Sequence, residues 1–247
     1  MASRQPAGPT VRPGLRVRKA QRAKQHASQV ARRLIHERGY DKTSLEDIAD
    51  EAETSVSTLL RYFGSKERLA LAAQVEAFES FQAMVTEEGP ASTLERWRLF
   101  VTTWAAEREP SSDWQADHDL IATVPAVHRL NSHLQRCYQD LLAASFAREA
   151  GVDPDHDLYG RLLAALLVAG NEAVFHRWLA TNRSRSLVET CLDVVDFAQS
   201  RLGDRSEVVG AGEDPTDVPS TVAPASEAGG RRRGPVDRDA HVAGTGR

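Results

Sequence analysis

The sequence has little of what marks secreted, disulfide-rich or membrane proteins. Its 247 residues include two cysteines, Cys137 and Cys191, too few for a disulfide framework. Both lie in helical patterns and are expected to be buried, reduced thiols, with a redox-sensing pair as the alternative. The longest apolar run, residues 162–170, is far shorter than a membrane-spanning segment, and no apolar stretch follows the basic N-terminus as in a secretory signal. We therefore expect a cytoplasmic protein.

Lysine is scarce and confined to one end of the chain. All four lysines lie in residues 1–70, which hold 14 Lys and Arg against eight Asp and Glu, whereas the remainder holds 17 against 27. The net charge of −4 thus combines a basic N-terminal part with an acidic body. This asymmetry is expected of a phosphate-binding module joined to a domain that does not bind nucleic acid.

Both ends lack the composition of a folded core. Residues 203–247 hold 8 of the 16 glycines and 4 of the 11 prolines, with no aromatic residue, Leu or Ile, which predicts a disordered tail. Its three consecutive arginines, 231–233, read as part of a solvated linker rather than as a DNA contact. Residues 1–15 are rich in Pro and Gly and predict a disordered basic arm. Since no acidic residue interrupts the basic positions from Arg4 to Lys24, we expect this arm to contact DNA, the alternative being a solvated tail.

The stretch Ser44–Glu67 has the pattern of two short helices separated by a tight turn, with another helix starting at its end. Ser44 and Asp47 have the spacing of a capping box, and Ser55 can cap the second helix. Leu59 and Phe63 are the inward residues of the second helix. Its outward positions are Val56, Ser57, Thr58, Leu60, Arg61 and Tyr62. This arrangement is the helix-turn-helix, whose second helix enters the major groove of DNA.

The same stretch resembles the DNA-binding signature of the TetR (tetracycline-repressor-like) family of transcriptional regulators. The residues that carry the resemblance are Gly39-Tyr40, Thr43-Ser44, Asp47-Ile48-Ala49, Ala52, Ser55, Thr58-Leu59, Tyr62-Phe63 and Ser65-Lys66-Glu67. Three positions depart from it: Glu53 stands where the family usually has Gly, Leu60 where an aromatic is common, and Tyr62 where His is common. A non-Gly residue in a left-handed turn costs on the order of 1 kcal/mol.

The predicted DNA contacts divide into two groups. Ser57, Leu60 and Arg61 are candidates for base edges. The candidates for phosphates are Thr43, Ser44, Thr58, Tyr62 and Lys66, the last implied by the resemblance, and Ser55 is included in the DNA-binding set as the cap of the reading helix.

The remaining chain is helical in pattern, which predicts an all-α fold of about nine helices. We expect a helix-turn-helix DNA-binding domain of three helices at residues 16–65, a helical domain at 66–202, and a long fourth helix from Lys66 to about Glu87 between them. The apolar helix at about 158–180 needs burial on several sides, by its own domain and a partner subunit.

The resemblance implies that the 66–202 domain dimerises and holds a small, mainly apolar ligand that releases DNA. The candidate ligand-binding residues are Phe100, Trp104, Trp114, His118, Tyr138, Asn171 and Phe175; plain core packing is the alternative for each.

No catalytic or metal motif stands out. Asp153, Asp155, His156 and Asp157 could hold a metal but are better explained as a capped loop. We therefore expect a homodimeric DNA-binding regulator with no cofactor, a repressor released from a palindromic operator by a small-molecule effector, and not an enzyme. A ligand-independent dimeric DNA-binding protein is the alternative, and a helical enzyme that uses His118 is a third, weaker one.

Overall fold

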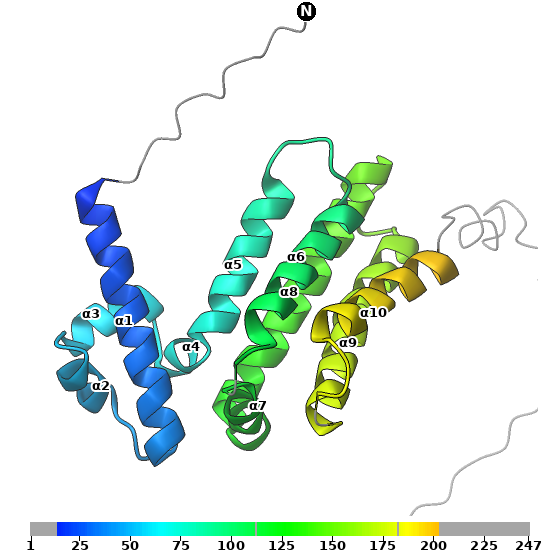
Figure 1. Ribbon diagram of the computed structural model, residues 1–247. Helices are drawn as coiled ribbons and strands as arrows, with labels where there is room; N and C mark the ends of the chain where they lie inside the picture. The colour runs from blue at the N-terminus through cyan, green and yellow to red at the C-terminus, as the bar shows by residue number, and fades with distance from the viewer. Residues whose placement is uncertain (1–13, 112, 182, 203–247) are drawn as a thin grey trace, which may run out of the picture. The chain divides into compact units, whose positions relative to one another are not determined.

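The computed structural model describes residues 14–111, 113–181 and 183–202, which form ten α-helices and no strand (Figure 1). The helices are α1 (Leu15–Arg38), α2 (Leu45–Glu51), α3 (Val56–Phe63), α4 (Lys66–Ala70), α5 (Ala72–Thr86), α6 (Thr93–Arg108), α7 (Trp114–Thr123), α8 (Pro125–Ala150), α9 (Leu158–Ala180) and α10 (Leu187–Leu202). The all-α prediction is confirmed. Residues 1–13 of the predicted arm, and the predicted tail with its arginines, lie outside the described residues.

The tenth helix comes from a break in the helix predicted from Lys66 to Glu87. The chain leaves helical geometry at Leu71, where φ is −103° and ψ is 28°. No Pro or Gly marks this break, so periodicity could not reveal it. Its cause is packing: Ala70 and Leu71 are buried in a cluster with Ile35 of α1 and Val127 of α8. The bend lets α4 join the first helices while α5 continues into the body.

Helices α1 to α4 share one apolar core. The apolar stripe of α1 meets Ile48 and Ala49 of α2, Leu59 and Phe63 of α3 and Leu69 of α4. The inward residues predicted for the helix-turn-helix are therefore the buried ones. With both short helices anchored on α1, the remaining faces of α3 are left to solvent.

A second core fills the body and is built mainly from α5, α6, α8, α9 and α10 (Figure 1). Phe81, Leu142 and Leu167 are among its fully buried side chains. Helix α9 packs along both α8 and α10. With 23 residues and a mean hydropathy of 1.3 in its most apolar window, α9 is long and apolar enough to cross a membrane. The expectation that no segment reaches that length considered only unbroken apolar runs and was wrong for a whole helix; 28% of the most apolar window of α9 is buried among the described residues.

Candidate functional site

Serine side chains define where the helices of the helix-turn-helix begin. The Ser44 hydroxyl accepts from the backbone N–H of Asp47, while the Asp47 carboxylate accepts from the backbone N–H of Ser44, 3.0 and 2.8 Å apart. The predicted capping box is thus confirmed. The Ser44 hydroxyl also donates to the Asp47 carboxylate, and this bond, followed by the one from the Ser44 backbone N–H, lowers the pKa of Asp47. Ser55 and Ser65 cap α3 and α4 in the same way, each accepting from the backbone N–H three residues on.

The turn between α2 and α3 keeps a left-handed residue even though that residue is glutamate. Glu53 has a φ of 49°, so the backbone adopts the conformation that glycine would adopt without strain. The amides that follow are held: the Glu53 N–H donates to Asp50 and the Thr54 N–H donates to Ala49. The chain therefore keeps the turn at a cost on the order of 1 kcal/mol.

The exposed side chains of α3 are polar except for Leu60. Ser57 and Arg61 are exposed, and Leu60 has 42% of its surface accessible. The Arg61 guanidinium lies 5.2 Å from the centre of the Tyr62 ring. The Ser55 hydroxyl lies 2.9 Å from those of both Ser57 and Thr58. Six of the nine predicted DNA-binding residues thus lie on α3 or at its cap, in one short segment: Ser55, Ser57, Thr58, Leu60, Arg61 and Tyr62.

Two residues predicted to contact phosphate are engaged within the protein. Thr43 is fully buried, and its hydroxyl lies 2.9 Å from the carbonyl oxygen of Gly39 and 3.3 Å from that of Leu34. This geometry contradicts a phosphate contact by the Thr43 side chain, which instead ties the end of α1 to the start of α2. The Ser44 hydroxyl donates to Asp47 at 2.6 Å.

Lys66 lies at the start of α4 and is half-buried. Its ammonium donates to the carbonyl oxygen of Tyr40 at 2.6 Å and lies 4.0 Å from the centre of the Tyr40 ring. The Tyr40 hydroxyl donates to Glu67 at 3.1 Å. An ammonium has three N–H donors, so Lys66 keeps donors for a phosphate at the edge of the helix-turn-helix.

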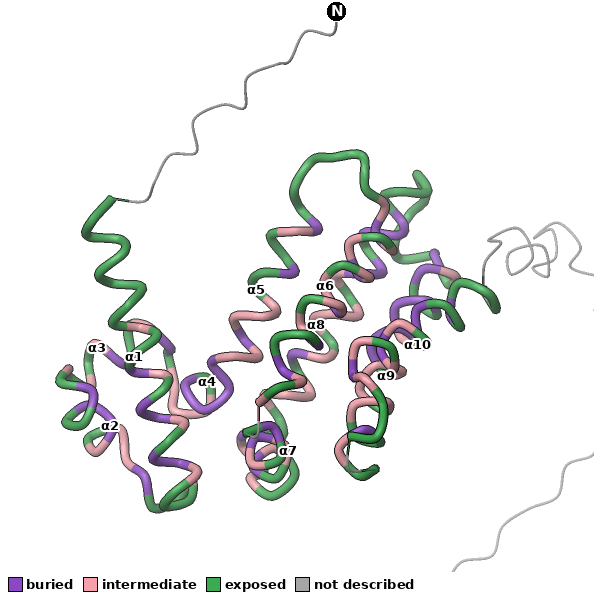
Figure 2. The backbone as a smooth tube through the Cα atoms, viewed as in Figure 1, coloured by how far each residue is buried: buried purple, intermediate pink, exposed green. Residues whose placement is uncertain are grey.

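The first turns of α1 are exposed and basic (Figure 2). Arg16, Arg18, Lys19 and Arg22 lie there with no acidic residue in the first turn. The basic positions from Arg16 onward thus lie in α1, close to the predicted start of the DNA-binding domain.

The body encloses a cavity of about 560 Å³ between α5, α6, α7, α8 and α9, with one residue of α10 on its wall. All seven predicted ligand-binding residues line it: Phe100, Trp104, Trp114, His118, Tyr138, Asn171 and Phe175. Their rings contact one another; the centroids of Trp104 and Phe175 are 5.4 Å apart, and those of Phe100 and Tyr138 are 5.7 Å apart. The wall is mainly aromatic, and burial raises the pKa of Tyr138, which favours its neutral phenol.

Several polar atoms on this wall have no hydrogen-bond partner among the described residues. They are the indole nitrogens of Trp97 and Trp114, Nδ1 of His118 and both amide atoms of Asn171, all buried. A buried donor or acceptor left unpaired costs about 1–3 kcal/mol. Natural proteins leave few such atoms, so the five on this wall are polar groups available to water or to another molecule in the cavity.

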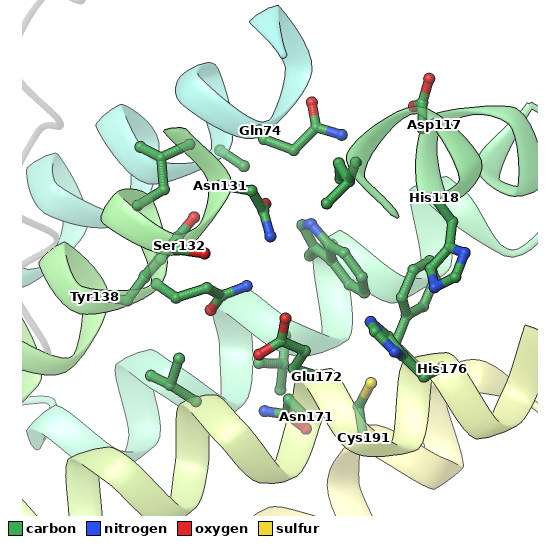
Figure 3. Close-up of a pocket in the computed structure, with 18 of the residues that line it drawn as sticks. Gln74, Asp117, His118, Asn131, Ser132, Tyr138, Asn171, Glu172, His176 and Cys191 are labelled. Atoms are coloured by element: carbon green, nitrogen blue, oxygen red, sulfur yellow. The ribbon is translucent and has the colours of Figure 1, made fainter. Parts of the chain in front are cut away.

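Sequence reasoning missed some polar residues of the cavity. Figure 3 shows Ser132, Glu172 and His176 around the cavity together with the predicted Asn171, and it shows the Asp117 carboxyl pointing away from His118 and His176. The rings of His118 and His176 are 4.6 Å apart at their centroids. A signal was available in the sequence: Glu172 and His176 follow Asn171 and Phe175 directly, so their helical positions neighbour those of predicted residues.

The aspartate-rich loop before α9 is a capped loop, as predicted. Asp153 accepts from the backbone N–H of Asp155 at 3.0 Å and contacts Nδ1 of His156 at 2.9 Å, and Asp157 caps α9 through the N–H of Gly160. Within the described residues no group of three or more His, Cys, Asp or Glu is placed to hold a metal ion.

Comparison with known families gives two matches. The family described as bacterial regulatory proteins, tetR family, matches residues 29–73, the segment from α1 to the start of α5. The MftR C-terminal domain matches residues 98–203, the body from α6 onward.

Individual relatives agree. The HTH-type transcriptional regulator TcmR of Streptomyces glaucescens is 29% identical over 176 residues, which cover 67% of this chain and 77% of TcmR. Among solved structures, the complex of SmeT with triclosan has a TM-score of 0.54 at 18% identity, covering 73% of this chain and 91% of that one. FadR from Bacillus subtilis, in complex with stearoyl-CoA, has a TM-score of 0.50 at 16% identity, covering 70% and 96%. At these identities the two structures show a common fold.

Proposed function

The chain belongs to the TetR family of transcriptional regulators, and we propose that it is a homodimeric repressor that leaves a palindromic operator when a small molecule fills the body cavity. The observation that carries this proposal is the cavity itself. The cavity has an aromatic wall with unpaired polar atoms. The same chain carries the exposed helix α3 of the helix-turn-helix. We propose a cytoplasmic location, where a bacterial regulator meets its DNA.

Residues on α3 and around it supply the DNA contacts. Ser57, Leu60 and Arg61 face base edges, and Thr58, Tyr62 and Lys66 hold phosphates. The fixed start of α3 at Ser55 keeps these side chains in register. Two-fold symmetry places a pair of such helices in successive major grooves about 34–36 Å apart, which is why the operator is expected to be a near-palindrome.

The second subunit covers apolar residues that α9 and α10 leave exposed. Leu158 and Leu162 on α9 have 63% and 45% of their surfaces accessible, and Phe197 on α10 has 52%. Large exposed apolar side chains grouped on neighbouring helices mark interaction surfaces, and identical subunits pair most often about a two-fold axis.

The effector is a flat, largely apolar molecule with a few polar groups at its edge. Ring walls favour stacking on a planar skeleton. The two indole N–H groups need acceptors such as carbonyl or ether oxygens, while the Asn171 amide can both donate and accept. Triclosan in SmeT and the stearoyl chain in FadR show that this fold can hold apolar molecules of different shapes.

A compound screen coupled to DNA binding tests the proposal. Full-length protein first selects duplexes from a random pool. Planar aromatic compounds and fatty acyl compounds are then screened for a rise in melting temperature, and those that raise it are added to the protein–duplex complex while fluorescence anisotropy is followed. Release of the duplex is expected.

Two neighbouring residues of α6 give a matched pair of variants. Phe100 lines the cavity, whereas Leu99 is 57% exposed and lies outside it. Phe100→Ala should weaken compound binding, and Leu99→Ala should leave it unchanged. If compounds bind in the cavity and the duplex stays bound, the protein binds DNA without an effector and the proposal is wrong.

A further inference from the structure

Arg32 of the first helix meets two carboxylates beside α7: Asp113, whose Oδ2 lies 3.4 Å from Nη1 of Arg32, and Asp117, which also lines the cavity. Asp117 of α7 is 4% exposed. The Arg32 side chain of α1 donates two parallel hydrogen bonds to the Asp117 carboxylate, from Nε to Oδ1 at 3.1 Å and from Nη2 to Oδ2 at 2.6 Å. Nε2 of His36, one turn further along α1, lies 3.0 Å from Oδ1 of the same carboxylate. The three side chains are separated by more than 80 positions in the sequence.

The same contact is part of the cavity wall. Asp117 and Trp114 both line the cavity and lie one turn apart on α7. The Arg32 guanidinium also lies 5.2 Å from the centre of the Trp114 ring. A molecule that occupies the cavity against Trp114 therefore presses on the helix that holds Asp117.

Helix α1 connects this contact to α3, the helix proposed to enter the major groove. Arg32 and His36 are four positions apart and lie on one side of α1. Ala27, Ala31 and Leu34 of the same helix pack into the core that buries Leu59 and Phe63 of α3. A displacement of the last two turns of α1 therefore moves the surface on which α3 rests.

We propose that the Arg32–Asp117–His36 contact is the positioning element through which an occupied cavity moves the DNA-binding helices. This inference rests on the proposed function, since it names how that cavity is coupled to DNA. A paired fork between guanidinium and carboxylate is directional, and separating it leaves a buried carboxylate uncompensated. When α7 shifts, α1 follows.

The apolar contact between α1 and the body depends less on exact geometry than the polar one does. Ile35, Leu71, Leu120 and Val127 form the neighbouring cluster. Apolar contacts are not directional, so these side chains can slide past one another while α7 moves. The polar contact therefore transmits the displacement, and the apolar cluster permits it.

Adjacent arginines provide matched variants. Arg32→Gln and Asp117→Asn break the fork. Arg33→Gln removes a similar ion pair, in which Arg33 lies 2.6 Å from Glu51 and 3.6 Å from Glu37, all within the α1–α2 part. Arg32→Lys keeps the charge but loses the fork, and it decides the matter if Asp117→Asn melts too early to assay.

A tethered aromatic group occupies the cavity without knowledge of the natural effector. Ser132 lines the cavity, and Ser132→Cys can be labelled with monobromobimane in a Cys137→Ser background. The native Cys191 also lines the cavity but is 1% exposed, and burial raises the pKa of its thiol to about 12, which disfavours the reactive thiolate. Cys137→Ser protein treated with the same reagent is the control. The affinity of full-length protein for a selected duplex is measured with and without the label, and the ratio of the two affinities is the readout. A contact that merely stabilises the fold leaves this ratio unchanged.

In the parent protein the label is expected to weaken DNA binding about tenfold, within the usual range for coupled sites. With Arg32→Gln or Asp117→Asn the ratio should fall below about twofold, and with Arg33→Gln it should remain near tenfold. If the label weakens DNA binding equally in all variants, the coupling role of Asp117 is refuted while the proposed function stands. If the label has no effect in the parent protein, the ligand-released function itself fails, and this inference with it.

Discussion

The helix-turn-helix and the cavity wall of the body differ in how their polar groups are satisfied. In the helix-turn-helix, Ser44, Ser55 and Ser65 each pair with a backbone N–H three residues away, so the local sequence completes the structure. In the body, Asn171 and the indoles of Trp97 and Trp114 are buried without partners among the described residues. The capping groups of the helix-turn-helix are thus paired within the chain, whereas the polar atoms of the cavity wall face an open cavity.

The largest expected effect concerns the packed core of the first region. Leu59→Ala should lower the free energy of unfolding by about 2–5 kcal/mol, because Leu59 is 1% exposed and anchors α3 on α1. Leu60→Ala, at the neighbouring exposed position, should change it by less than about 0.5 kcal/mol. Urea titrations of both variants measure the difference. Equal losses would show that α3 does not depend on its buried side.

The next effect distinguishes a residue proposed to contact bases from one proposed to contact phosphates. Arg61→Ala should cost about 1–3 kcal/mol of binding to the selected duplex and relax the preference at one base position. Lys66→Ala should weaken binding to all sequences alike and reduce the slope of log affinity against log salt by about one. Salt titrations with selected and unrelated duplexes distinguish the two patterns. A Lys66 variant with an unchanged salt slope would remove Lys66 from the interface.

A substitution in the cavity should raise the free energy of unfolding, whereas Leu59→Ala in the helix-turn-helix should lower it. Asn171→Leu replaces a buried amide, both of whose atoms lack partners, with an apolar side chain of similar size. We expect the free energy of unfolding to rise by about 1–2 kcal/mol, because an unpaired polar group is removed. The gain should come with weaker compound binding. Asn131→Leu is the control, since Asn131 lines the same cavity and has no buried unpaired atom in the described structure. A loss of stability in Asn171→Leu would show that the amide is satisfied in solution.

The smallest effect tests a cap. Ser44→Ala should lower the free energy of unfolding by about 1 kcal/mol. Bonds from Ser44 lower the pKa of Asp47 in the folded protein. This contribution is therefore present above the unfolded pKa of a carboxyl group and is lost as pH falls through the folded pKa. Thermal melts at neutral and acidic pH should show the difference between wild type and Ser44→Ala shrink on acidification. A constant difference would contradict the bond that the Ser44 hydroxyl donates to the Asp47 carboxylate.

Local chemistry explains how much could be predicted from sequence. The serine caps and the inward Leu59 and Phe63 depend on residues within one or two turns, so spacing alone predicts them, whereas the left-handed turn at Glu53 is implied by the family resemblance. The aromatic wall of the cavity was also predictable, because its residues occupy inward helical faces. The break at Leu71 was not, since it is caused by Ile35 and Val127, residues distant in the chain.

Two side chains are placed in ways that sequence reasoning did not reveal, Thr43 by a local contact and Asp117 by a long-range one. Thr43 has the residue type and place of a phosphate ligand, yet it is buried under α1 because its hydroxyl meets carbonyl groups at the end of that helix. Asp117 has no distinguishing local pattern, and only the fold brings it to Arg32 and His36. A carboxylate in a helical segment is most often solvated, and no single-sequence signal shows which one is enclosed.

The residues around the cavity begin at Gln74 and continue to Cys191, while the proposed DNA contacts end at Lys66, so the two sets share no member. Under the proposed function, substitutions around the cavity can therefore change which molecule binds there without changing the DNA sequence that is recognised, and substitutions in the DNA contacts can do the reverse. On the coupling proposed above, such independent drift is bounded by three side chains, Arg32, His36 and Asp117, which would have to persist while both sets diverge.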